Sequence, residues 1–115
     1  MHGEGRYVWA DKKEYEGQWF QNKIHGYGTM KYPDESRYEG NFYENNRQGE
    51  GVHRFTDGSI YEGYWNEDKR DGLGVFYKNN NENQEDVTYG IWEEDELVKD
   101  LPHTEYLADM KKISD

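Results

Sequence analysis

The stretch that decides the fold is residues 15–37, YEGQWFQNKIHGYGTMKYPDESR. Its first element, YEGQW at 15–19, recurs as YEGNF at 38–42 and as YEGYW at 61–65, 23 residues further along each time. Its second element, HGYG at 25–28, recurs as QGEG at 48–51 and as DGLG at 71–74. A period of this length is typical of repeat architectures, in which stacked copies of one supersecondary unit share a continuous core.

Partial copies flank the three full units. HGEG at 2–5 precedes the first unit at the same spacing, and TYGIW at 88–92 is a degenerate copy that comes 27 residues after its predecessor. The four additional residues fall in the polar stretch 78–86, which we expect to be a lengthened loop. The predicted organisation is a half unit at 1–14, full units at 15–37, 38–60 and 61–87, a half unit at 88–92, an acidic linker at 93–100 and a helix at 101–115.

Each unit is predicted to be a β-hairpin, because two short alternating segments are separated by turn residues. One turn is expected at 22–23, 45–46 and 68–69, and a second tight turn at 11–12, 34–35 and 57–58, since Asn, Asp and Gly tolerate positive φ angles. Consecutive strands must then pair as neighbours. We therefore predict an all-β fold, an elongated single-layer antiparallel meander of about eight strands, roughly 35 Å long at about 4.8 Å per strand.

Alternation along the strands places the aromatic residues and the repeat glycines on one face of this sheet. We expect the rings to lie across the bare glycine backbone of neighbouring strands. The opposite face, with Glu16, Glu39 and Glu62, is predicted to contact solvent. The glycines with this structural role are Gly17, Gly26, Gly28, Gly40, Gly49, Gly51, Gly63, Gly72 and Gly74.

Composition supports a folded chain with an unusual core. Of 115 residues, only 32% are hydrophobic and 34% are charged, which by itself would favour disorder. Aromatic residues nevertheless make up 17% of the chain, and twelve of its 13 glycines occupy repeat positions. The apolar surface therefore comes mainly from aromatic rings.

The charge balance restricts the classes of partner. A net charge of −11 argues against nucleic acid, whose affinity comes from neutralising phosphates, and disfavours an anionic membrane. The chain has no cysteine, no apolar run near the roughly 20 residues of a membrane span, and no hydrophobic signal region at 1–7. We expect a cytoplasmic protein whose partners are proteins.

No catalytic or metal-binding constellation is evident. His2 and His25 share a repeat position that holds Gln and Asp in later units, and His53 shares one that holds Met and Phe. The glycine pairs precede another strand rather than the helix of a phosphate-binding loop. The acidic run 93–96 lacks the central glycine of a calcium loop. The sequence therefore predicts no enzyme activity, no cofactor and no metal site.

The C-terminal segment differs from the repeats. Its apolar residues Tyr106, Leu107, Met110 and Ile113 approach helical spacing, and Pro102 suits a first helical turn. We predict a short amphipathic helix. Two roles remain open for it: covering the last strand, or docking a partner.

The pattern Tyr-x-Gly-x-Trp/Phe followed by His-Gly-x-Gly resembles the MORN repeat (membrane occupation and recognition nexus), over residues 1–92. The strongest match is the unit 15–37, whereas Phe42 replaces Trp in the second unit and Thr88 replaces Tyr in the last. The resemblance implies a twisted single sheet of hairpins with aromatic grooves, and a scaffolding role. Members that resemble this chain lie in ciliary axonemes, radial spoke heads, other cytoskeletal assemblies and membrane junctions.

We therefore predict a non-catalytic scaffold or adaptor for protein–protein interactions in a cytoskeletal assembly, with the ciliary or flagellar axoneme as the favoured setting. Two alternatives stay open: a phosphoinositide or membrane-recruitment module, and a regulatory arm of an enzyme on another chain. Acidic neighbours should select a basic or amphipathic partner segment. The free edge of the first strand, near Gly3 to Trp9, could also pair with a second copy or a neighbour. The predicted partner-binding groove comprises Tyr15, Trp19, Tyr38, Phe42, Tyr61 and Trp65.

Overall fold

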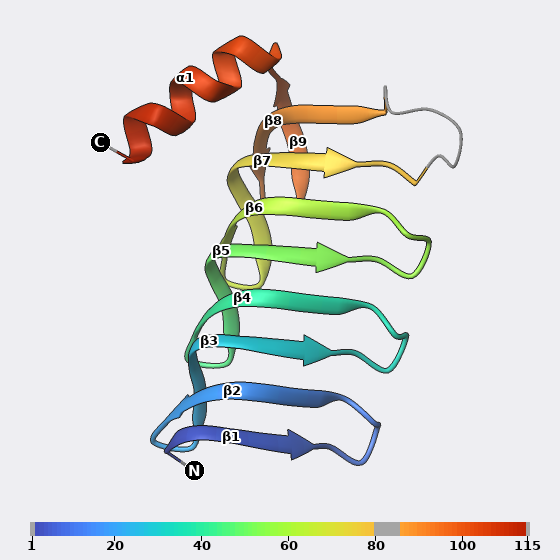
Figure 1. Ribbon diagram of the computed structural model, residues 1–115, viewed down its shortest axis with the longest axis vertical. Helices are drawn as coiled ribbons and strands as arrows, with labels where there is room; N and C mark the ends of the chain where they lie inside the picture. The colour runs from blue at the N-terminus through green and yellow to red at the C-terminus, as the bar shows by residue number, and fades with distance from the viewer. Residues whose placement is uncertain (1, 80–85, 115) are drawn as a thin grey trace.

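A computed structural model describes residues 2–79 and 86–114, and its elements follow one another in a single antiparallel sheet with the strand order of the chain. The sheet is a ladder of hairpins, and the helix α1 departs from the end opposite the N-terminus (Figure 1). The strand order β1 to β9 confirms the predicted all-β antiparallel meander, and the structure measures 43 × 36 × 20 Å. The elements are β1 (Gly3–Val8), β2 (Glu14–Phe20), β3 (Lys23–Lys31), β4 (Arg37–Tyr43), β5 (Asn46–Arg54), β6 (Ile60–Asn66), β7 (Lys69–Tyr77), β8 (Val87–Glu93), β9 (Glu96–Asp100) and α1 (His103–Ser114).

Strand β9 is an addition to the predicted fold. The acidic segment 93–100 is not a linker: it finishes β8, turns at Glu94 and Asp95, and returns as β9, with Leu97 opposite Trp92. The turn has the same left-handed φ angles, 47° and 72°, as those of the earlier units. The Glu-Asp turn signal was hidden within a run of four acidic residues. Most of the lengthened loop predicted at 78–86 lies outside the described residues.

The turns that close β2–β3 and its two repeats lie one residue earlier than predicted. Both residues of each turn have positive φ, as in Gln21 (48°) and Asn22 (65°), and the next unit repeats this at Glu44 and Asn45. This is a two-residue turn whose twist matches that of the strands, and it requires left-handed conformations at both positions. The Asn or Asp therefore ends the turn rather than starting it.

The turns at the other end of the hairpins are not two-residue turns. Lys12 donates a backbone hydrogen bond to Trp9 O (2.9 Å), Trp9 donates to Lys13 O (2.8 Å), and within this loop only Lys12 has a positive φ, 78°. That is the three-residue loop in which a type I turn is followed by a left-handed residue. Asp11 Oδ1 stabilises it by accepting from the Lys13 amide (2.9 Å).

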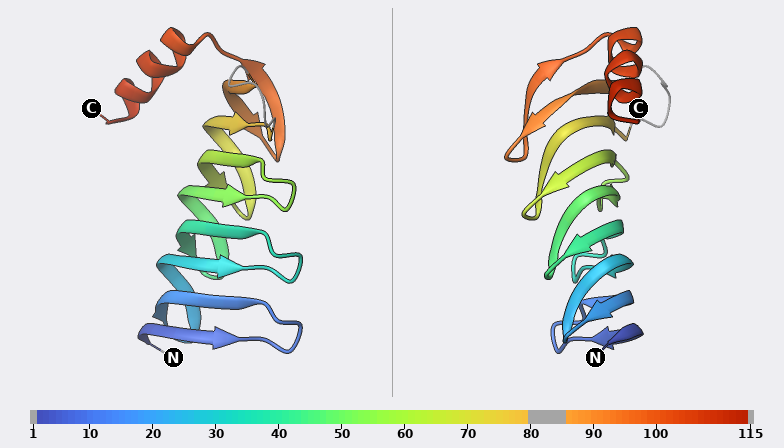
Figure 2. Two further views of the ribbon diagram at one scale, coloured as in Figure 1. Left: turned by 45° about the vertical axis from the view of Figure 1, so that its right-hand side comes forward. Right: turned by 90° about the vertical axis from the view of Figure 1, so that its left-hand side faces the viewer.

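A bulge in the longer strand bends each hairpin. Between the pairs Gly17–Gly28 and Trp19–Ile24, β2 advances two residues while β3 advances four. Gly26 lies within this bulge with φ +100°, a conformation that residues with a Cβ rarely adopt. The long strands β3, β5 and β7 curve strongly (Figure 2). The buried aromatic side chains cluster on the inner side of the sheet. We call this inner side the ring face and the opposite side, which carries Glu16 and Glu39, the outer face.

Glycines pair with glycines from β1 to β8. Gly28, for example, lies between Gly17 and Gly40, and the row continues to Gly74 and Gly90. The Tyr15 ring covers Gly28 so closely that an added Cβ would come under 3.0 Å from the ring. Tyr15 Oη donates to the Gln18 carbonyl (2.9 Å), and the equivalent tyrosines of the next two units do the same. The predicted packing of rings over bare backbone is confirmed.

The core is a continuous series of edge-to-face aromatic contacts. The Tyr38 ring lies 5.0 Å from Phe42 and 5.3 Å from Trp65, at 81° and 86°. Equivalent contacts link Tyr15 to Phe42 and Tyr61 to Trp92, so each tyrosine joins its own repeat to the next one. The edge-to-face arrangement is the favourable geometry for ring quadrupoles.

The outer face contacts solvent over most of its length, as predicted, but not at its C-terminal end. Leu73 and Val75 are buried there. The first turn of α1 lies against this region: His103 stacks on Tyr89 with centroids 4.5 Å apart, and Tyr106 follows at 5.1 Å. The sequence pattern alone could not locate the helix.

Candidate functional site

The six aromatic residues predicted to form a groove lie together on the ring face, and all are buried, with exposed fractions of 0 to 8%. Their own repeats cover them. A partner on this face would therefore contact the side chains that surround the six rings.

A second row of rings is accessible beside this core. Trp9, Tyr32, Phe55 and Phe76 are half-buried and pack against the buried rings. The first three occupy one repeat position, immediately after the strand and before the Asp-containing turn. The groove predicted from the sequence does not include these four rings. Their position at strand ends, where the sheet offers less cover, was the signal that could have identified them.

A cavity of about 610 Å³ opens on the ring face at the first repeat. Its walls are mainly apolar, and the Lys13 ammonium lies 4.7 Å from the Trp9 ring centroid. Such an arrangement suits a bulky apolar side chain better than a charged ligand. The lining residues are Tyr7, Trp9, Lys13, Trp19, Asn22, Ile24, Met30 and Asn45.

A second cavity, of about 520 Å³, lies one repeat further along. Tyr32 takes the place of Trp9, while Arg47 and His53 replace Ile24 and Met30. Two apolar lining positions of the first cavity are thus basic or polar in the second, although the backbone is the same.

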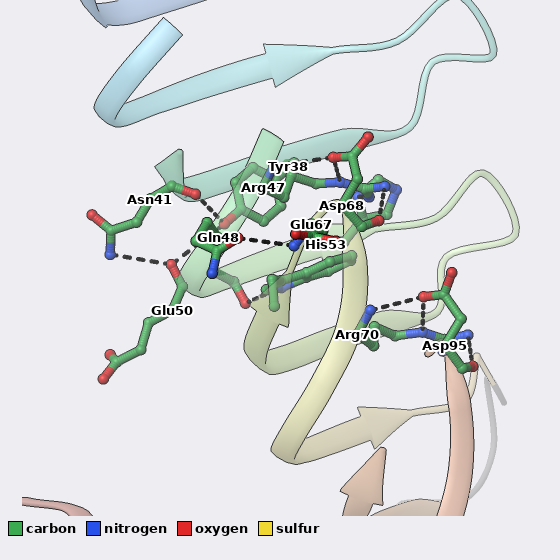
Figure 3. Close-up of polar contacts among 12 residues, drawn as sticks. Tyr38, Asn41, Arg47, Gln48, Glu50, His53, Glu67, Asp68, Arg70 and Asp95 are labelled. Carbon is green, nitrogen blue, oxygen red and sulfur yellow. Dashed lines mark hydrogen bonds and ion pairs between the residues drawn. The ribbon is translucent and has the colours of Figure 1, made fainter. Parts of the chain in front are cut away.

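Arg47 connects two repeats through its guanidinium group. The group lies 4.4 Å from the Trp65 ring centroid, and it donates to Asp68 Oδ1 (2.9 Å) and to the Asp68 carbonyl (2.8 Å). Arg70 and Asp95 repeat this geometry in the following unit (Figure 3). The hairpin turn of one unit is thus attached to the strand of the unit before it.

From residue 15 onward, successive units are also joined by hydrogen bonds of the backbone amides. The Arg47 amide donates to Asp68 Oδ1 (3.0 Å), and the Asp68 amide donates to the Arg47 carbonyl (3.0 Å). In the first repeat, Ile24 and Asn45 form the corresponding two bonds at 2.9 and 2.8 Å. This explains why the turn position holds Asn or Asp, because either side chain supplies the acceptor.

The side chains of Tyr32 and His53 on the ring face are uncharged at pH 7. Burial, and secondly the Arg47 guanidinium, lower the pKa of His53 to about 4, so His53 Nδ1 accepts a hydrogen bond from Arg47 Nη1 (3.2 Å). Burial raises the pKa of Tyr32 to about 12. The phenols and the imidazole therefore act as uncharged packing groups.

The remaining histidines lie beside aromatic rings. His25 is 5.9 Å from Phe20 and 4.9 Å from Tyr43, both on the outer face. Within residues 2–79 and 86–114, no group of three His, Asp or Glu side chains could hold a metal ion. No helix in this part of the chain is long and apolar enough to cross a membrane.

The other predicted contact elements are also located. Along α1, Tyr106 and Met110 are half-buried, whereas Leu107 and Ile113 are 52% and 54% exposed. The helix therefore covers β7 and β8 with its first turn only. Strand β1 pairs with β2 and forms one edge of the sheet.

Replacing Arg47 by Ala is expected to lower the free energy of unfolding by about 2 kcal/mol, because two charge-assisted hydrogen bonds to Asp68 and the contact with Trp65 are lost. Urea denaturation measures this loss. Arg54→Ala, on an exposed side chain with the same charge, serves as the control and should change stability by less than about 0.5 kcal/mol. Equal effects of the two substitutions would show that the Arg47 contact contributes no specific stability.

Comparison with known proteins agrees with this geometry. The sequence profile of the MORN repeat matches residues 1–13, 15–37, 38–60 and 61–82. A search among curated proteins finds no match. MORN repeats are non-catalytic modules that act as scaffolds for interactions with proteins or membranes. With four consecutive matches along most of its length, the chain belongs to the MORN-repeat family.

Proposed function

We propose that this protein is a scaffold without catalytic activity, which holds an amphipathic or basic segment of a partner protein against its ring face. The observation that carries the proposal is the pair of cavities, one repeat apart, that open beside the half-buried rings Trp9 and Tyr32. Repeating cavities on a rigid sheet can receive side chains at a regular spacing along a bound segment.

The chemistry of the cavity walls defines the segment. Partly exposed aromatic rings surrounded by a covered core are typical of residues that dominate binding energy. Exposed carboxylates of Asp11, Asp34 and Asp57 stand at the turns beside these cavities, and Asp34 lines the second one. Apolar side chains would enter the cavities, while lysine or arginine side chains would contact the aspartates.

For the cellular setting we propose a cytoskeletal assembly, and within that class the ciliary or flagellar axoneme. The family supports the role of scaffold, and the axonemal setting depends on the resemblance to members found in axonemes and radial spokes. A membrane-recruitment module is the alternative that the family permits. The acidic balance of the chain favours protein partners over an anionic lipid surface.

A pull-down with cross-linking mass spectrometry from ciliated cells tests the proposal, with the whole chain as bait. Lysine cross-links from Lys12 and Lys13, beside the first cavity, to axonemal or other filament proteins are the expected result. Trp9→Ala should reduce the captured partner at least tenfold, because the ring forms one wall of that cavity.

Tyr43→Ala is the matched control, since it removes an exposed ring from the outer face. The melting temperature of each variant shows that both remain folded. If Trp9→Ala leaves capture unchanged, the ring face is not the binding surface. Salt-sensitive flotation of the chain with phosphoinositide vesicles, lost in Trp9→Ala, would support the membrane alternative instead.

A further inference from the structure

A groove lies between the helix α1 and the outer face of the sheet, on the side opposite the ring face. The helix is anchored at β7 and β8 by its first turn and then projects away from them (Figures 1 and 2). The groove, of about 280 Å³, lies between the helix side chains Tyr106 and Met110 and the strands β4 to β6. None of the buried core rings lines it.

Carboxylates from three successive strands line this groove: Glu39 of β4, Glu50 of β5 and Glu62 of β6. Its described lining residues include no lysine and no arginine, and within the described chain none of the three carboxylates forms an ion pair. We call this feature the acidic groove. Among its described lining residues, the groove therefore carries negative charge only.

Two tyrosines donate hydrogen bonds to two of the three carboxylates at the groove. Tyr27 Oη donates to Glu39 Oε1 (2.8 Å) and Tyr64 Oη donates to Glu50 Oε1 (3.0 Å). The hydrogen bond to Glu39 raises the pKa of Tyr27, so the phenol keeps its proton and remains a donor. Glu39 and Glu50 are thus held in place, and an incoming cation does not have to order them.

The remaining walls are apolar or bare. Val52 and the backbone of Gly40, Gly51 and Gly63 line the groove on the sheet side, and the half-buried Met110 lines it on the helix side. Glycine backbone permits close approach of another chain. Lysine and arginine side chains combine an aliphatic stem with a charged end, and they match a groove with apolar walls and carboxylates.

We propose that the acidic groove binds a lysine- or arginine-rich segment of a partner protein, and that α1 forms one wall of the site. Adjacent strands are about 4.8 Å apart, so Glu39 and Glu62 are separated by about 10 Å across the sheet. Two turns of a helix rise about 11 Å. Basic residues at positions i and i+7 of a partner helix would therefore reach Glu39 and Glu62, which both flank Val52 in the register. A basic residue at i+3 or i+4 would extend towards Glu50, two residues further along β5.

The test uses the full chain and a fluorescent synthetic amphipathic peptide with lysine on one helical face and leucine on the other. Replacing Glu39, Glu50 and Glu62 together by Gln should weaken binding about tenfold, measured by fluorescence anisotropy at low salt. Salt should weaken binding to the unmodified chain. The matched control replaces Glu44, Glu67 and Glu94 by Gln, since these exposed turn residues give the same change in net charge away from the groove. That control should alter affinity less than twofold.

A second pair of variants tests the helix wall. Met110→Ser should weaken binding severalfold, and Leu107→Ser, on the same helix but not lining the groove, should not. Equal losses in the two glutamate triples would overturn the proposal, because binding would then follow net charge alone. Tighter binding after Met110→Ser would also overturn it, since α1 itself would be the occupant. Trp9→Ala leaves this groove intact, so failure here is distinguishable from failure of the ring-face proposal.

Discussion

Gly51→Ala is expected to lower the free energy of unfolding by about 3–5 kcal/mol. An added Cβ at Gly51 would lie under 3.0 Å from Tyr38 Oη and from carbons of the same ring. Tyr38 cannot move aside, because it is fully buried between Phe42 and Trp65 and its hydroxyl donates to the Asn41 carbonyl (2.8 Å). Equilibrium denaturation in urea measures the effect.

Two companion variants identify the cause. Gly49→Ala has its nearest contact at an ordinary 3.5 Å but requires φ near +90°, so only a conformational cost of about 1–2 kcal/mol is expected. Tyr38→Leu combined with Gly51→Ala should cost less than the sum of the two single changes, because the smaller side chain relieves the clash. Additive costs would mean that the ring does not impose glycine at this position.

Lowering the pH from 7 to 4 is expected to reduce the free energy of unfolding by about 3 kcal/mol through His53. Burial lowers its pKa from 6.5 to about 4 in the folded chain, so the unfolded chain binds a proton first. Each unit of difference is about 1.4 kcal/mol. The stabilising contribution is complete above pH 6.5 and is lost as the pH falls from 6.5 towards 4. Urea denaturation at several pH values across this window provides the measurement.

His53→Phe is the control, because the next unit holds Phe76 at this repeat position and a phenyl ring does not titrate. This variant should lose most of the pH dependence between 6.5 and 4. Hydrogen bonds from Ser36 and Ser59 lower the pKa values of Asp34 and Asp57 below 3.8, so the stability that they provide is lost at lower pH, outside the window. An unchanged slope in His53→Phe would contradict the assignment.

The prediction of this fold from sequence succeeded where the information is local. The YEGQW element and its copies define strands, their alternation defines faces, and the constant spacing forces neighbouring strands to pair. Turn positions were less accurate, because a left-handed residue at Gln21 or Glu44 is imposed by the twist of the paired strands and not by residue type. The strand β9 was missed for a related reason, since its turn residues Glu94 and Asp95 lie within an acidic run.

The candidate sites could not be located from the sequence, because they are formed by contacts between residues far apart in the chain. Arg47 meets Asp68 across 21 residues, and only the bulge that bends each hairpin brings the two together. Whether a ring is buried or accessible depends on what the neighbouring repeat covers, which is why Trp19 is core while Trp9 borders a cavity.

The sequence by itself determined the family, the repeated hairpin, the aromatic and glycine face and the net charge, because each of these follows from residue type at a fixed period. Tertiary structure alone decided which rings remain accessible, how one repeat is attached to the next, and where α1 lies. It also brought Glu39, Glu50 and Glu62 from three strands into one groove beside α1. These features arise from packing between elements far apart in the chain, and packing depends on the shapes of all the partners at once.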